Sequence, residues 1–587
     1  MFRRVARHLK NWILSLPLFR VLRGYRREDL GHDAKAGVNV ALLDFPQGMA
    51  YAMIAGLPVQ FGIYSSAIGS ITGPIFASSR FLMLGPTNAS AVLLLSGFLT
   101  LNLPEEKKLA ALPILLLMIA AILFVGALLR VEVVIQYVSR AVIAGYITAA
   151  ACLIIINQMR YVLGLEIPKS GTFGGAFLQT LRHLPETHLP SLLFSVGAFA
   201  VYFLLKKTLR FLPTVAVTLA VMTGIYQWLK GHGYAFETLP HVAAGHWPLT
   251  LPVFSLDLVS QLSGTAFAVA FLSLLESSSI AKALAARSGD TVDIRQQMCS
   301  MGVANTVNAF GSGMPVSGSL TRSMLNYSSG ARSPVSSMIS GVILVIGVLA
   351  CGPLIAFIPK AALASLVILV GASLIRPETI KTFLRVSRSD ASTFIVTFVS
   401  GLLFPLDMAI YLGVGLSILL FLKKVARPKL VEYDFNPSGE LAEKQEEEVS
   451  AISIVHVEGD LFFGATDVFL DQMRDLVQTP KIKVVILRLF NAHHIDGSAT
   501  LAIMDLVRFA RNQGREVLIS GIHDDIDPII KRSGIADLVG EENMFHYTPE
   551  NVTLSTRNAL LRAQQIIGDE KADIILYAKE KEEGAEK

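Results

Sequence analysis

The feature that most limits how this chain can fold is a succession of apolar segments that runs from Gly37 to about Lys424. Most of them are about 15–22 residues long, close to the length that an α-helix needs to cross a bilayer. The third and the tenth are too short to cross as ordinary helices. The pattern predicts an α-helical polytopic membrane protein with fourteen transmembrane segments: 37–56, 61–78, 86–100, 109–129, 137–157, 191–206, 211–229, 259–281, 294–311, 319–329, 334–351, 360–375, 390–405 and 408–423.

Composition supports this class of protein. Charged residues make up 17% of the 587 positions, whereas about a quarter is usual in soluble domains. The mean hydropathy is +0.54. The net charge of +5 is small for this length and does not indicate nucleic acid as a partner.

The placement of the basic residues predicts the orientation. Met1–Arg27 contains eight Lys or Arg residues and no acid, which places an N-terminal region over 1–36 in the cytoplasm. An amphipathic helix lying on anionic lipid is an alternative that gives the same orientation. An even number of segments returns the chain to the cytoplasm, and the basic flank Lys423–Lys429 agrees. We therefore expect a multi-pass protein of the plasma or inner membrane with both termini cytoplasmic.

The apolar region, 37–424, contains signs of an internal repeat. Asp44 is the only charged residue from Ala36 to Ser79, and Glu276 is the only one from Leu258 to Ala281. From Asp44 to Pro86 is 42 residues, and from Glu276 to Ser319 is 43. Each half thus places an acid and then a broken helix in the same register, which predicts a 7+7 inverted repeat over about 37–229 and 259–424.

Two polar breaks interrupt the apolar segments, one at Gly85–Ser90 and one at Gly311–Ser323. Irregular backbone at membrane depth is tolerated where it is enclosed by protein or lines a cavity. A helix that begins at such a break presents unpaired N–H groups and a positive dipole end, which suit an anion. Candidate anion ligands are the polar residues at the two helix starts: Thr87, Asn88, Ser319, Thr321 and Arg322. Arg322 has an alternative role, because its charge could neutralise a buried acid or reach an interface.

The two acids within the membrane are candidates for ion coupling. Glu276 lies among several serines and could help to bind Na⁺ or carry a proton, and Asp44 could do the same. Structural hydrogen bonding to a neighbouring helix is the alternative for each. Gln47 and Tyr51 share a helix face with Asp44, and an expected break at Pro46 would open the backbone beside them. These two are therefore added to the candidate anion ligands, with helix–helix packing as the alternative.

After a charged linker, 425–450, the periodicity changes. Buried strands are predicted at 452–457, 484–489 and 516–520, and amphipathic helices at 466–478, 498–512 and 525–533. This alternation predicts a small α/β domain over 451–560, followed by a charged tail over 561–587. Asp496 or Ser498 would cap the second helix. The chain contains no P-loop, GxSxG or HExxH pattern, so nothing indicates an enzyme.

Several motifs together resemble the sulfate permease (SulP) family of anion transporters, whose members carry a C-terminal STAS domain. The resemblance covers nearly the whole chain. It rests on PQGMAYA at 46–52, AGLP at 55–58, GIYS at 62–65, Gly85-Pro86, Glu276-Ser277 with AKALA at 281–285, PVSGSLTRS at 315–323 and PKAAL at 359–363.

This resemblance implies fourteen segments arranged as a core domain and a gate domain, with an elevator-like movement of the core. The anion would lie between the third and tenth helices, where Gln47 and Tyr51 line the pocket and Thr87, Thr321 and Arg322 stand at the helix starts. Glu276 occupies a position that is aspartate in Na⁺-coupled bicarbonate relatives. Dimers are the habit of the family. The STAS position that is phosphorylated in some relatives is Gly497 here, so such a switch is not expected.

We therefore expect a secondary active transporter of small inorganic oxyanions such as sulfate or bicarbonate, coupled to H⁺ or Na⁺. The alternatives are an uncoupled exchanger or channel, and a membrane-anchored STAS signalling module. Expected partners are the anion, the lipid bilayer, a second copy of the chain and a cytoplasmic protein at the STAS domain, but no nucleic acid. No cofactor or metal is expected, apart from Na⁺ or H⁺ as the coupling ion, with any Na⁺ site near Glu276.

Overall fold

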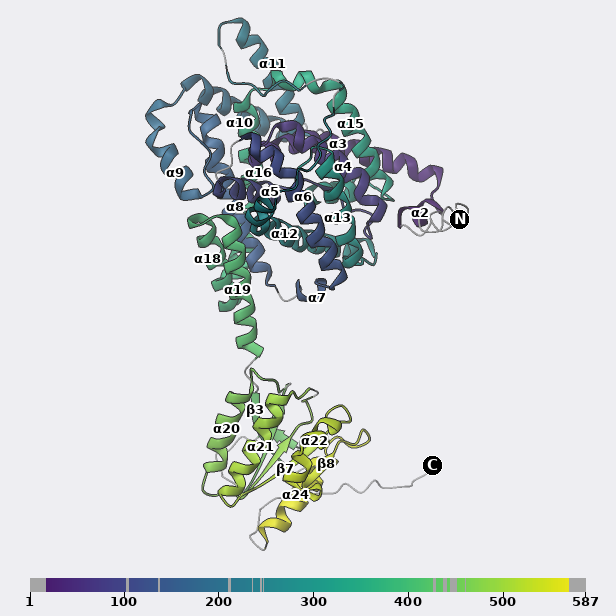
Figure 1. Cartoon of the computed structure of the whole chain (residues 1–587), viewed down its shortest axis with the longest axis vertical. Coiled ribbons are helices and arrows are strands. Elements are labelled where there is room, and N and C mark those ends of the chain that lie inside the picture. Colours follow the sequence, from purple (N-terminus) through teal and green to yellow (C-terminus); the bar gives the residue numbers. More distant parts are fainter. Residues whose placement is uncertain are drawn as a thin grey trace. The chain divides into compact units, whose positions relative to one another are not determined.

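The computed structural model describes residues 17–101, 105–135, 138–208, 213–234, 236–242, 245, 247–425, 429–435, 441–443, 451–459, 461–492 and 494–568. Residues within it form two compact units, Met1–Ile418 and Leu419–Lys587 (Figure 1). The first unit is helical and the second is an α/β domain. Each unit is described by itself below.

Every one of the fourteen predicted segments overlaps a helix of the structure. In the first half these helices are α3 (Arg27–Ala55), α4 (Val59–Phe76), α5 (Asn88–Thr100), α6 (Glu105–Leu128), α8 (Arg140–Leu163), α10 (Leu189–Thr208) and α11 (Thr214–Gly231). In the second half they are α12 (Leu256–Ser288), α13 (Ile294–Phe310), α14 (Leu320–Ser328), α15 (Val335–Cys351), α16 (Lys360–Leu374), α18 (Arg388–Leu403) and α19 (Leu406–Val425).

Short elements complete the helical unit. Before α3 lies α2 (Pro17–Leu22), and α7 (Glu132–Ile135) precedes α8. An amphipathic helix follows the fifth helix of each half, α9 (Phe173–Arg182) in the first and α17 (Pro377–Val386) in the second. The remaining turns are the 3₁₀ helices η1 (Leu184–Glu186) and η2 (Gly352–Phe357).

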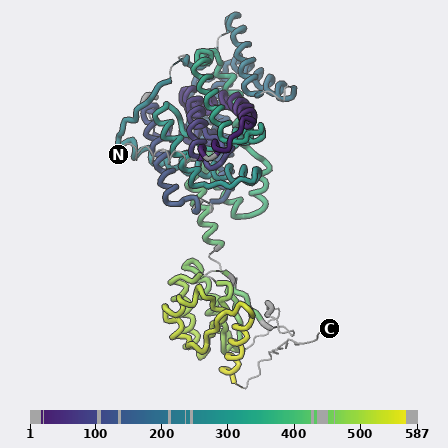
Figure 2. Tube along the Cα trace, turned by 90° about the vertical axis from the view of Figure 1, so that its right-hand side faces the viewer, coloured from purple at the N-terminus to yellow at the C-terminus, as the bar shows by residue number. Residues whose placement is uncertain are grey.

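The packing of the helices shows the repeat directly. Equivalent helices of the two halves are α3 and α12, α4 and α13, α5 and α14, and α6 and α15. The main contacts between a helix of one half and a helix of the other have counterparts in which the two halves swap places. Thus α4 packs on α15 as α13 packs on α6, and α3 packs on α14 and α15 as α12 packs on α5 and α6. Likewise α8 packs on α18 as α16 packs on α10. The two halves interleave and do not form separate lobes, as the purple and teal tubes of Figure 2 show.

These contacts divide the unit into two groups of helices. We call α3–α6 with α12–α15 the core, and α8, α10, α11, α16 and α18 the gate. We add α19 to the gate, because it approaches α8 and α18 closely at Gly413 and Gly401. In Figure 1, α3, α4, α13 and α15 lie on the right of the unit and α8, α9 and α10 on the left. The fold class predicted from the sequence, a 7+7 inverted repeat with core and gate followed by an α/β domain, is confirmed.

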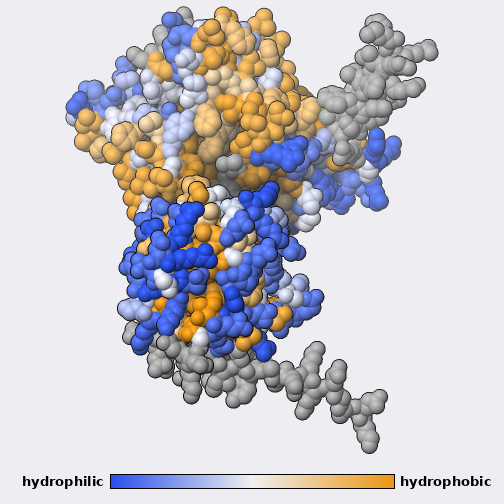
Figure 3. Space-filling view, turned by 60° about the horizontal axis from the view of Figure 1, so that its bottom comes forward, coloured by the Kyte–Doolittle hydropathy of each residue, from blue (hydrophilic) through white to orange (hydrophobic). Residues whose placement is uncertain are grey.

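The outer surface of the helical unit suits a bilayer. Among the described residues, seven helices are long and apolar enough to cross a membrane by length and composition alone. Other helices, such as α3, bury polar side chains and so have a lower hydropathy. Figure 3 shows a mostly hydrophobic surface on this unit and a mostly hydrophilic one on the α/β unit. The number of fourteen spans stays a prediction, because length and composition identify only half of them.

The α/β unit is built on a six-stranded sheet in the order β4-β3-β5-β6-β7-β8. The strands are β3 (Lys429–Phe435), β4 (Leu441–Glu443), β5 (Ile452–Glu458), β6 (Val484–Arg488), β7 (Glu516–Ile522) and β8 (Met544–His546). From β5 to β8 the strands are parallel, while β3 pairs antiparallel with both β4 and β5. The sheet therefore extends into the stretch that the sequence indicated as a linker.

Helices cover both faces of this sheet. They are α20 (Thr466–Gln478), α21 (Gly497–Asn512), α22 (Asp527–Ser533), α23 (Ile535–Val539) and α24 (Leu554–Ile567), with η3 (Glu541–Asn543) before β8. One hydrophobic cluster joins α20 and α21 to the sheet and a second joins α24 to it. The predicted strands and the helices at 466–478, 498–512 and 525–533 are confirmed. Asp496 caps α21 by accepting from the N–H of Ala499 at 2.9 Å. The part of the predicted charged tail after Gly568 lies outside the described residues.

Candidate functional site

The two polar breaks meet inside the core. Strand β1 (Leu84–Gly85) pairs antiparallel with β2 (Ser317–Gly318), so that Leu84 faces Gly318 and Gly85 faces Ser317. The short helices α5 and α14 begin just beyond this pairing. Each break thus supplies hydrogen-bond partners for the other where β1 and β2 pair, so this part of the irregular backbone is satisfied without water or lipid.

Side chains reinforce this junction. The N–H of Met83 donates to Ser323 Oγ at 2.9 Å, and the N–H of Ser319 donates to the carbonyl of Met83 at 3.0 Å. The N–H of Gly318 donates to Ser277 Oγ of α12 at 2.8 Å. The start of α14 is thus fixed to the first break on one side and to α12 on the other.

Arg322 forms a buried ion pair with Asp44. Both side chains are completely buried, and Arg322 Nη1 lies 2.5 Å from Asp44 Oδ1. Ser66 Oγ donates to the same carboxylate oxygen at 2.9 Å, and Arg322 Nη2 donates to the carbonyl of Pro86 at 2.7 Å. The structure therefore brings together two predicted site residues from opposite halves. The sequence left the partner of Arg322 open, and the geometry gives it Asp44 instead of Glu276.

Gly85 provides the space for this pair. A Cβ at position 85 would lie 2.5 Å from Arg322 Nη1 and 2.9 Å from its Cζ. Any side chain there would push on the guanidinium at the point where it bonds Asp44. The glycine of the first break is thus required by close approach of a charged group.

The start of α5 is capped by its own residues. Thr87 Oγ1 accepts from the N–H of Ser90 at 3.3 Å, and Ser90 Oγ accepts from the N–H of Thr87 at 3.1 Å, which is a capping box. Thr87 Oγ1 also lies 3.2 Å from Ser317 Oγ of the second break. Asn88 turns its Oδ1 to the N–H of Ala89 at 2.9 Å. Most hydrogen-bonding capacity at this helix start is therefore already in use.

The start of α14 is different. Ser319 is its N-cap residue, but the Ser319 side chain makes no capping hydrogen bond. Within the described part of the chain, the N–H groups of Leu320, Thr321 and Arg322 have no partner. Ser319 is buried, whereas Thr321 is exposed. This helix start therefore offers unpaired donors together with the positive end of its dipole, as an anion site requires.

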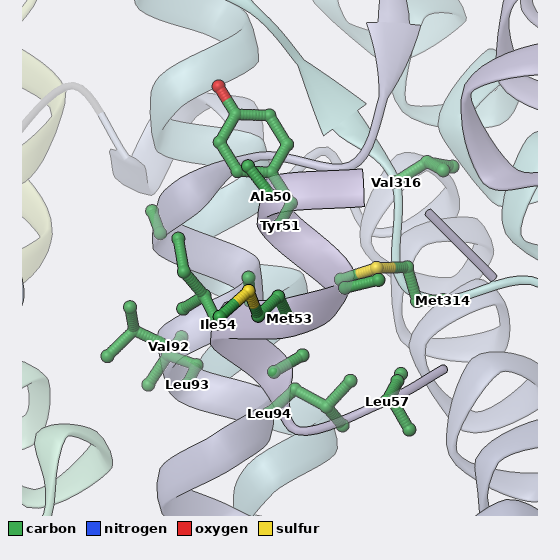
Figure 4. Close-up of a cluster of buried hydrophobic side chains, with 14 of the residues drawn as sticks. Ala50, Tyr51, Met53, Ile54, Leu57, Val92, Leu93, Leu94, Met314 and Val316 are labelled. Atoms are coloured by element: carbon green, nitrogen blue, oxygen red, sulfur yellow. The ribbon is translucent and has the colours of Figure 1, made fainter. Parts of the chain in front are cut away.

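Gln47 and Tyr51 lie on the buried face of α3. The Oε1 atom of Gln47 is buried without a hydrogen-bond partner among the described residues. Tyr51 belongs to the same buried cluster as Met53, Ile54 and the α5 side chains, and its hydroxyl points away from these labelled residues (Figure 4). That hydroxyl lies within electrostatic range of Arg322, Asp44 and Glu276. Tyr51 is therefore close enough to interact electrostatically with charged groups from both halves of the repeat.

One sequence expectation about this face is wrong. A break was expected at Pro46, but α3 runs without interruption from Arg27 to Ala55 and contains Pro46. Tight packing explains this, because α3 is in contact with α4, α5, α14 and α15 along its length. Contacts of this kind hold a helix together even where proline removes one hydrogen bond.

Glu276 stands apart from the Asp44–Arg322 pair. It is partly buried in α12 and forms no hydrogen bond or ion pair with any described residue. Its neighbour Ser277 is tied to the start of α14. On the gate side, Tyr146 of α8 lies within electrostatic range of Glu276 and donates to the carbonyl of Ala89 at 3.0 Å. Glu276 thus carries a charge near the breaks that no described residue neutralises.

The sequence reasoning missed three residues of this region: Ser66, Ser317 and Tyr146. Ser66 and Ser317 bond to predicted site residues from other helices, and Tyr146 joins the gate to the start of α5. Serine and tyrosine are frequent in the apolar segments, so their identity alone gave no signal. Ser317 could have been found, because it lies inside the break itself.

The fold and the site define a class of membrane protein: an inverted-repeat polytopic protein in which two half-helices meet in the core, as in secondary transporters. Comparison with known families gives the same class. Residues 30–397 match the model of the Sulfate permease family, and residues 443–550 match that of the STAS domain. The first match covers more than half of the chain. The chain therefore belongs to the sulfate permease family and carries a C-terminal STAS domain.

Individual proteins agree with this assignment. The chain is 29% identical over 570 residues to the protein named Sulfate transporter 4.1, chloroplastic, of Arabidopsis thaliana, covering 92% of this chain and 82% of that protein. The structure of the murine Solute Carrier 26 family member A9 anion transporter in its inward-facing state superposes with a TM-score of 0.84 at 22% identity, over 94% of each chain. The transmembrane domain of the cyanobacterial bicarbonate transporter BicA superposes with a TM-score of 0.59 at 20% identity, over 67% of this chain and 99% of that domain.

Proposed function

We propose that this protein is a secondary active transporter of small inorganic oxyanions of the sulfate or bicarbonate class. The observation that carries the proposal is the unpaired first turn of α14, set in the core of a sulfate permease family member. The donors there are the N–H groups of residues 320–322 with the hydroxyls of Ser319 and Thr321. Such a turn binds an anion through hydrogen bonds and the helix dipole.

The residues opposite this turn complete the proposed site. No hydrogen bond from Gln47 to another described residue is seen, and its amide oxygen is buried without a partner. Its NH₂ group can therefore donate to the anion. The Tyr51 hydroxyl can donate in the same way. Asn88 keeps its NH₂ group available, because its Oδ1 accepts from Ala89. Thr87 then acts as a clamp between the two breaks, and the anion lies between the starts of α5 and α14.

Arg322 contributes to this site indirectly and does not bind the anion. Its guanidinium is bonded to Asp44 and to the carbonyl of Pro86. We propose that the pair fixes the two half-helices and leaves recognition of the anion to neutral donors. Neutral donors suit transport, because a substrate held by a buried full charge would be released slowly.

The balance of charge in the core gives the basis for coupling the anion to H⁺ or Na⁺. Asp44 and Arg322 neutralise each other, so an ionised Glu276 leaves the core with one uncompensated negative charge near the anion. Repulsion between the two anions is removed when Glu276 takes up a proton or binds Na⁺. Binding of the cation and binding of the anion therefore favour each other, which is the thermodynamic basis of symport. Asp44 takes no part in this exchange while it is paired with Arg322.

The movement of the protein, its membrane and its partners are also part of the proposal. The core moves against the gate like an elevator, in a plasma or inner membrane with both termini in the cytoplasm. The protein acts as a homodimer, and the STAS domain binds a cytoplasmic protein partner. The basic residues before α3 and at the end of α19 support the orientation.

Uptake into proteoliposomes tests the proposal. Sulfate and bicarbonate are compared under an inward H⁺ gradient, an inward Na⁺ gradient and neither. Uptake driven by one gradient names the coupling ion, and Glu276→Gln then removes the response to that gradient. Glu378→Gln, in the exposed first turn of α17, is the matched control and keeps the response. Uptake that ignores both gradients but needs internal anion identifies an exchanger. Absence of flux for every anion tested contradicts the transporter function.

A further inference from the structure

Helix α17 joins two helices of the gate, α16 and α18, and packs mainly on α18 and α8. Its side chains divide into two faces. Ile380, Phe383 and Leu384 lie three and four residues apart and form an apolar face. Lys381 and Arg385 lie on the opposite face. No residue of α17 is buried, and Leu384 is 45% exposed. The described chain therefore covers the apolar face of α17 only in part.

The polar face of this segment is cationic. Residues 376–388 contain four cations and one acid, Glu378. The next acid, Asp390 of α18, accepts from Ser139 Oγ at 2.8 Å, and this contact brings the exposed Arg140 of α8 to the same side. All four cations of the segment are exposed, and none forms an ion pair with another described residue: Arg376, Lys381, Arg385 and Arg388. Cations thus outnumber acids on α17 and on the starts of the helices beside it.

The repeat provides an internal comparison, helix α9. It follows α8 as α17 follows α16, so the two helices are counterparts at opposite faces of the membrane. The apolar face is present in α9 as well, where Phe177 is 48% exposed and Leu181 is 54% exposed. However, α9 contains a single charged residue, Arg182. An apolar face is therefore common to both positions, whereas the cationic face of α17 is not required by the fold.

The side of the membrane on which α17 lies gives these cations a meaning. It is the face where α18 begins and where α19 ends, which is the cytoplasmic face in the orientation proposed above. A bias of basic residues toward the cytoplasm is general and explains how many cations are present. It does not explain why they follow one side of a helix, opposite an apolar face. That arrangement is typical of helices that lie in the surface of an anionic bilayer.

We propose that α17 is a binding site for anionic phospholipids. Its apolar face enters the outer part of the acyl-chain region, and Lys381 and Arg385 contact the phosphate groups. Because α17 is connected directly to α16 and α18, bound lipid holds the gate at one depth in the bilayer. In the elevator movement proposed above, on which this consequence alone rests, the gate then stays in place while the core moves.

Photocrosslinking tests this site in the full-length protein. The protein is placed in nanodiscs of phosphatidylcholine and phosphatidylglycerol, and one of the two lipids carries a photoreactive group in each sample. Adducts on residues 376–388 are quantified by mass spectrometry, and the ratio of phosphatidylglycerol to phosphatidylcholine adducts is normalised to the lipid composition. We expect a ratio on the order of ten at low salt, because each cation near an anionic surface contributes roughly fivefold. The ratio should fall as ionic strength rises.

Substitutions make the test specific to α17. Lys381→Gln/Arg385→Gln should lower the ratio roughly five- to tenfold. Lys381→Arg/Arg385→Lys keeps both charges and should keep the preference. The matched control, Lys206→Gln/Lys207→Gln, removes two exposed charges from the end of α10 on the same face and should leave the ratio on residues 376–388 unchanged. In the same samples, adducts on α9 should show a ratio close to one, since both leaflets contain the same lipids.

Three results would refute the proposal. An equal preference for phosphatidylglycerol on α9 and α17 would mean that the cationic face does not select the lipid. A loss in the α10 variant as large as in the α17 variant would indicate a general attraction of anionic lipid to a basic surface. Absence of adducts of either lipid on residues 376–388 would show that protein, such as a second copy of the chain, covers α17. The measurement needs no transport, so it tests the lipid site even if the chain moves no anion.

Discussion

Substitutions in the Asp44–Arg322 ion pair can distinguish a structural role of Arg322 from direct binding of the anion. Asp44→Asn removes the charge that neutralises a guanidinium with no exposed side-chain area. The carbonyl of Pro86 and the hydroxyl of Ser66 remain as neutral partners. Breaking a buried pair on one side costs about 3–5 kcal/mol, because the remaining charge stays buried without compensation. We expect a loss of this size in the stability of the helical unit.

Removing both charges should cost much less. In Asp44→Asn/Arg322→Gln no buried charge remains, and replacement of a buried pair by neutral groups is often nearly neutral in energy. We expect the double variant to recover most of the stability lost by Asp44→Asn, so that the double-mutant cycle gives a coupling of several kcal/mol. The surface pair Arg80–Asp290 is the matched control, with Arg80 43% exposed in its side chain. Its removal should cost about 0–1 kcal/mol.

The assay combines stability with transport. Thermal unfolding of all variants is measured in one detergent at one scan rate, because unfolding of membrane proteins is commonly irreversible and the midpoint then depends on rate. Sulfate KM is measured on the variants that fold. If Arg322 acts through the pair, the double variant is stable and keeps a KM close to that of the wild type. A stable double variant that no longer binds sulfate would refute our assignment and make Arg322 an anion ligand. A double variant no more stable than Asp44→Asn would refute the energetic argument.

Three further predictions follow from single contacts. Gly85→Ala places a methyl group against the Arg322 guanidinium, and should lower the thermal midpoint by an amount equivalent to about 1–3 kcal/mol. Asp33→Asn should cost about 1–3 kcal/mol in the same assay, because the buried carboxylate accepts from the N–H groups of Arg332 at 2.7 Å and Ser333 at 3.1 Å in the turn before α15. In the isolated α/β unit, the hydrogen bond from Lys531 holds the pKa of Asp527 below its usual value. Its contribution is therefore complete above the unfolded-state pKa and disappears as pH falls through the folded-state pKa, so chemical denaturation should distinguish Asp527→Asn from wild type at neutral pH and not in acid.

The sequence predicted the helices of this protein well, because length and hydropathy decide where a chain can cross a bilayer. Equal spacing from Asp44 to Pro86 and from Glu276 to Ser319 predicted the repeat that the exchanged helix contacts show. The strand β3 was harder to find, since its lysine and acids made it look like part of the charged linker. Periodicity is a weak signal where a strand lies near an exposed end of a sheet.

The contacts of the site could not be predicted in the same way. Arg322 and Asp44 are 278 positions apart, and nothing local determines which of two acids the guanidinium reaches. The pairing of β1 with β2 also depends on how the two halves approach each other. Pro46 gave a misleading local signal, because neighbouring helices hold α3 together across it. Local rules thus located the candidate residues, and only the fold showed how they are paired.

The distribution of these long-range contacts bears on how such a protein can work. The β1–β2 pairing, the Asp44–Arg322 pair and the bond from Gly318 to Ser277 all join elements of the core to one another. A displacement of the core against the gate leaves every one of them intact. Both half-helices and the acid of α12 would therefore travel together, and the site would keep its geometry at both faces of the membrane. The proposed movement would instead break contacts across the boundary, such as those from Tyr146 to Ala89 and from Lys169 to Met53. Bonds from α19 to α5 and α12, such as that from Tyr411 to the carbonyl of Gly264, would have to exchange as well. All of these contacts lie at the boundary between core and gate, so a movement of this kind would remake the boundary and leave the site unchanged.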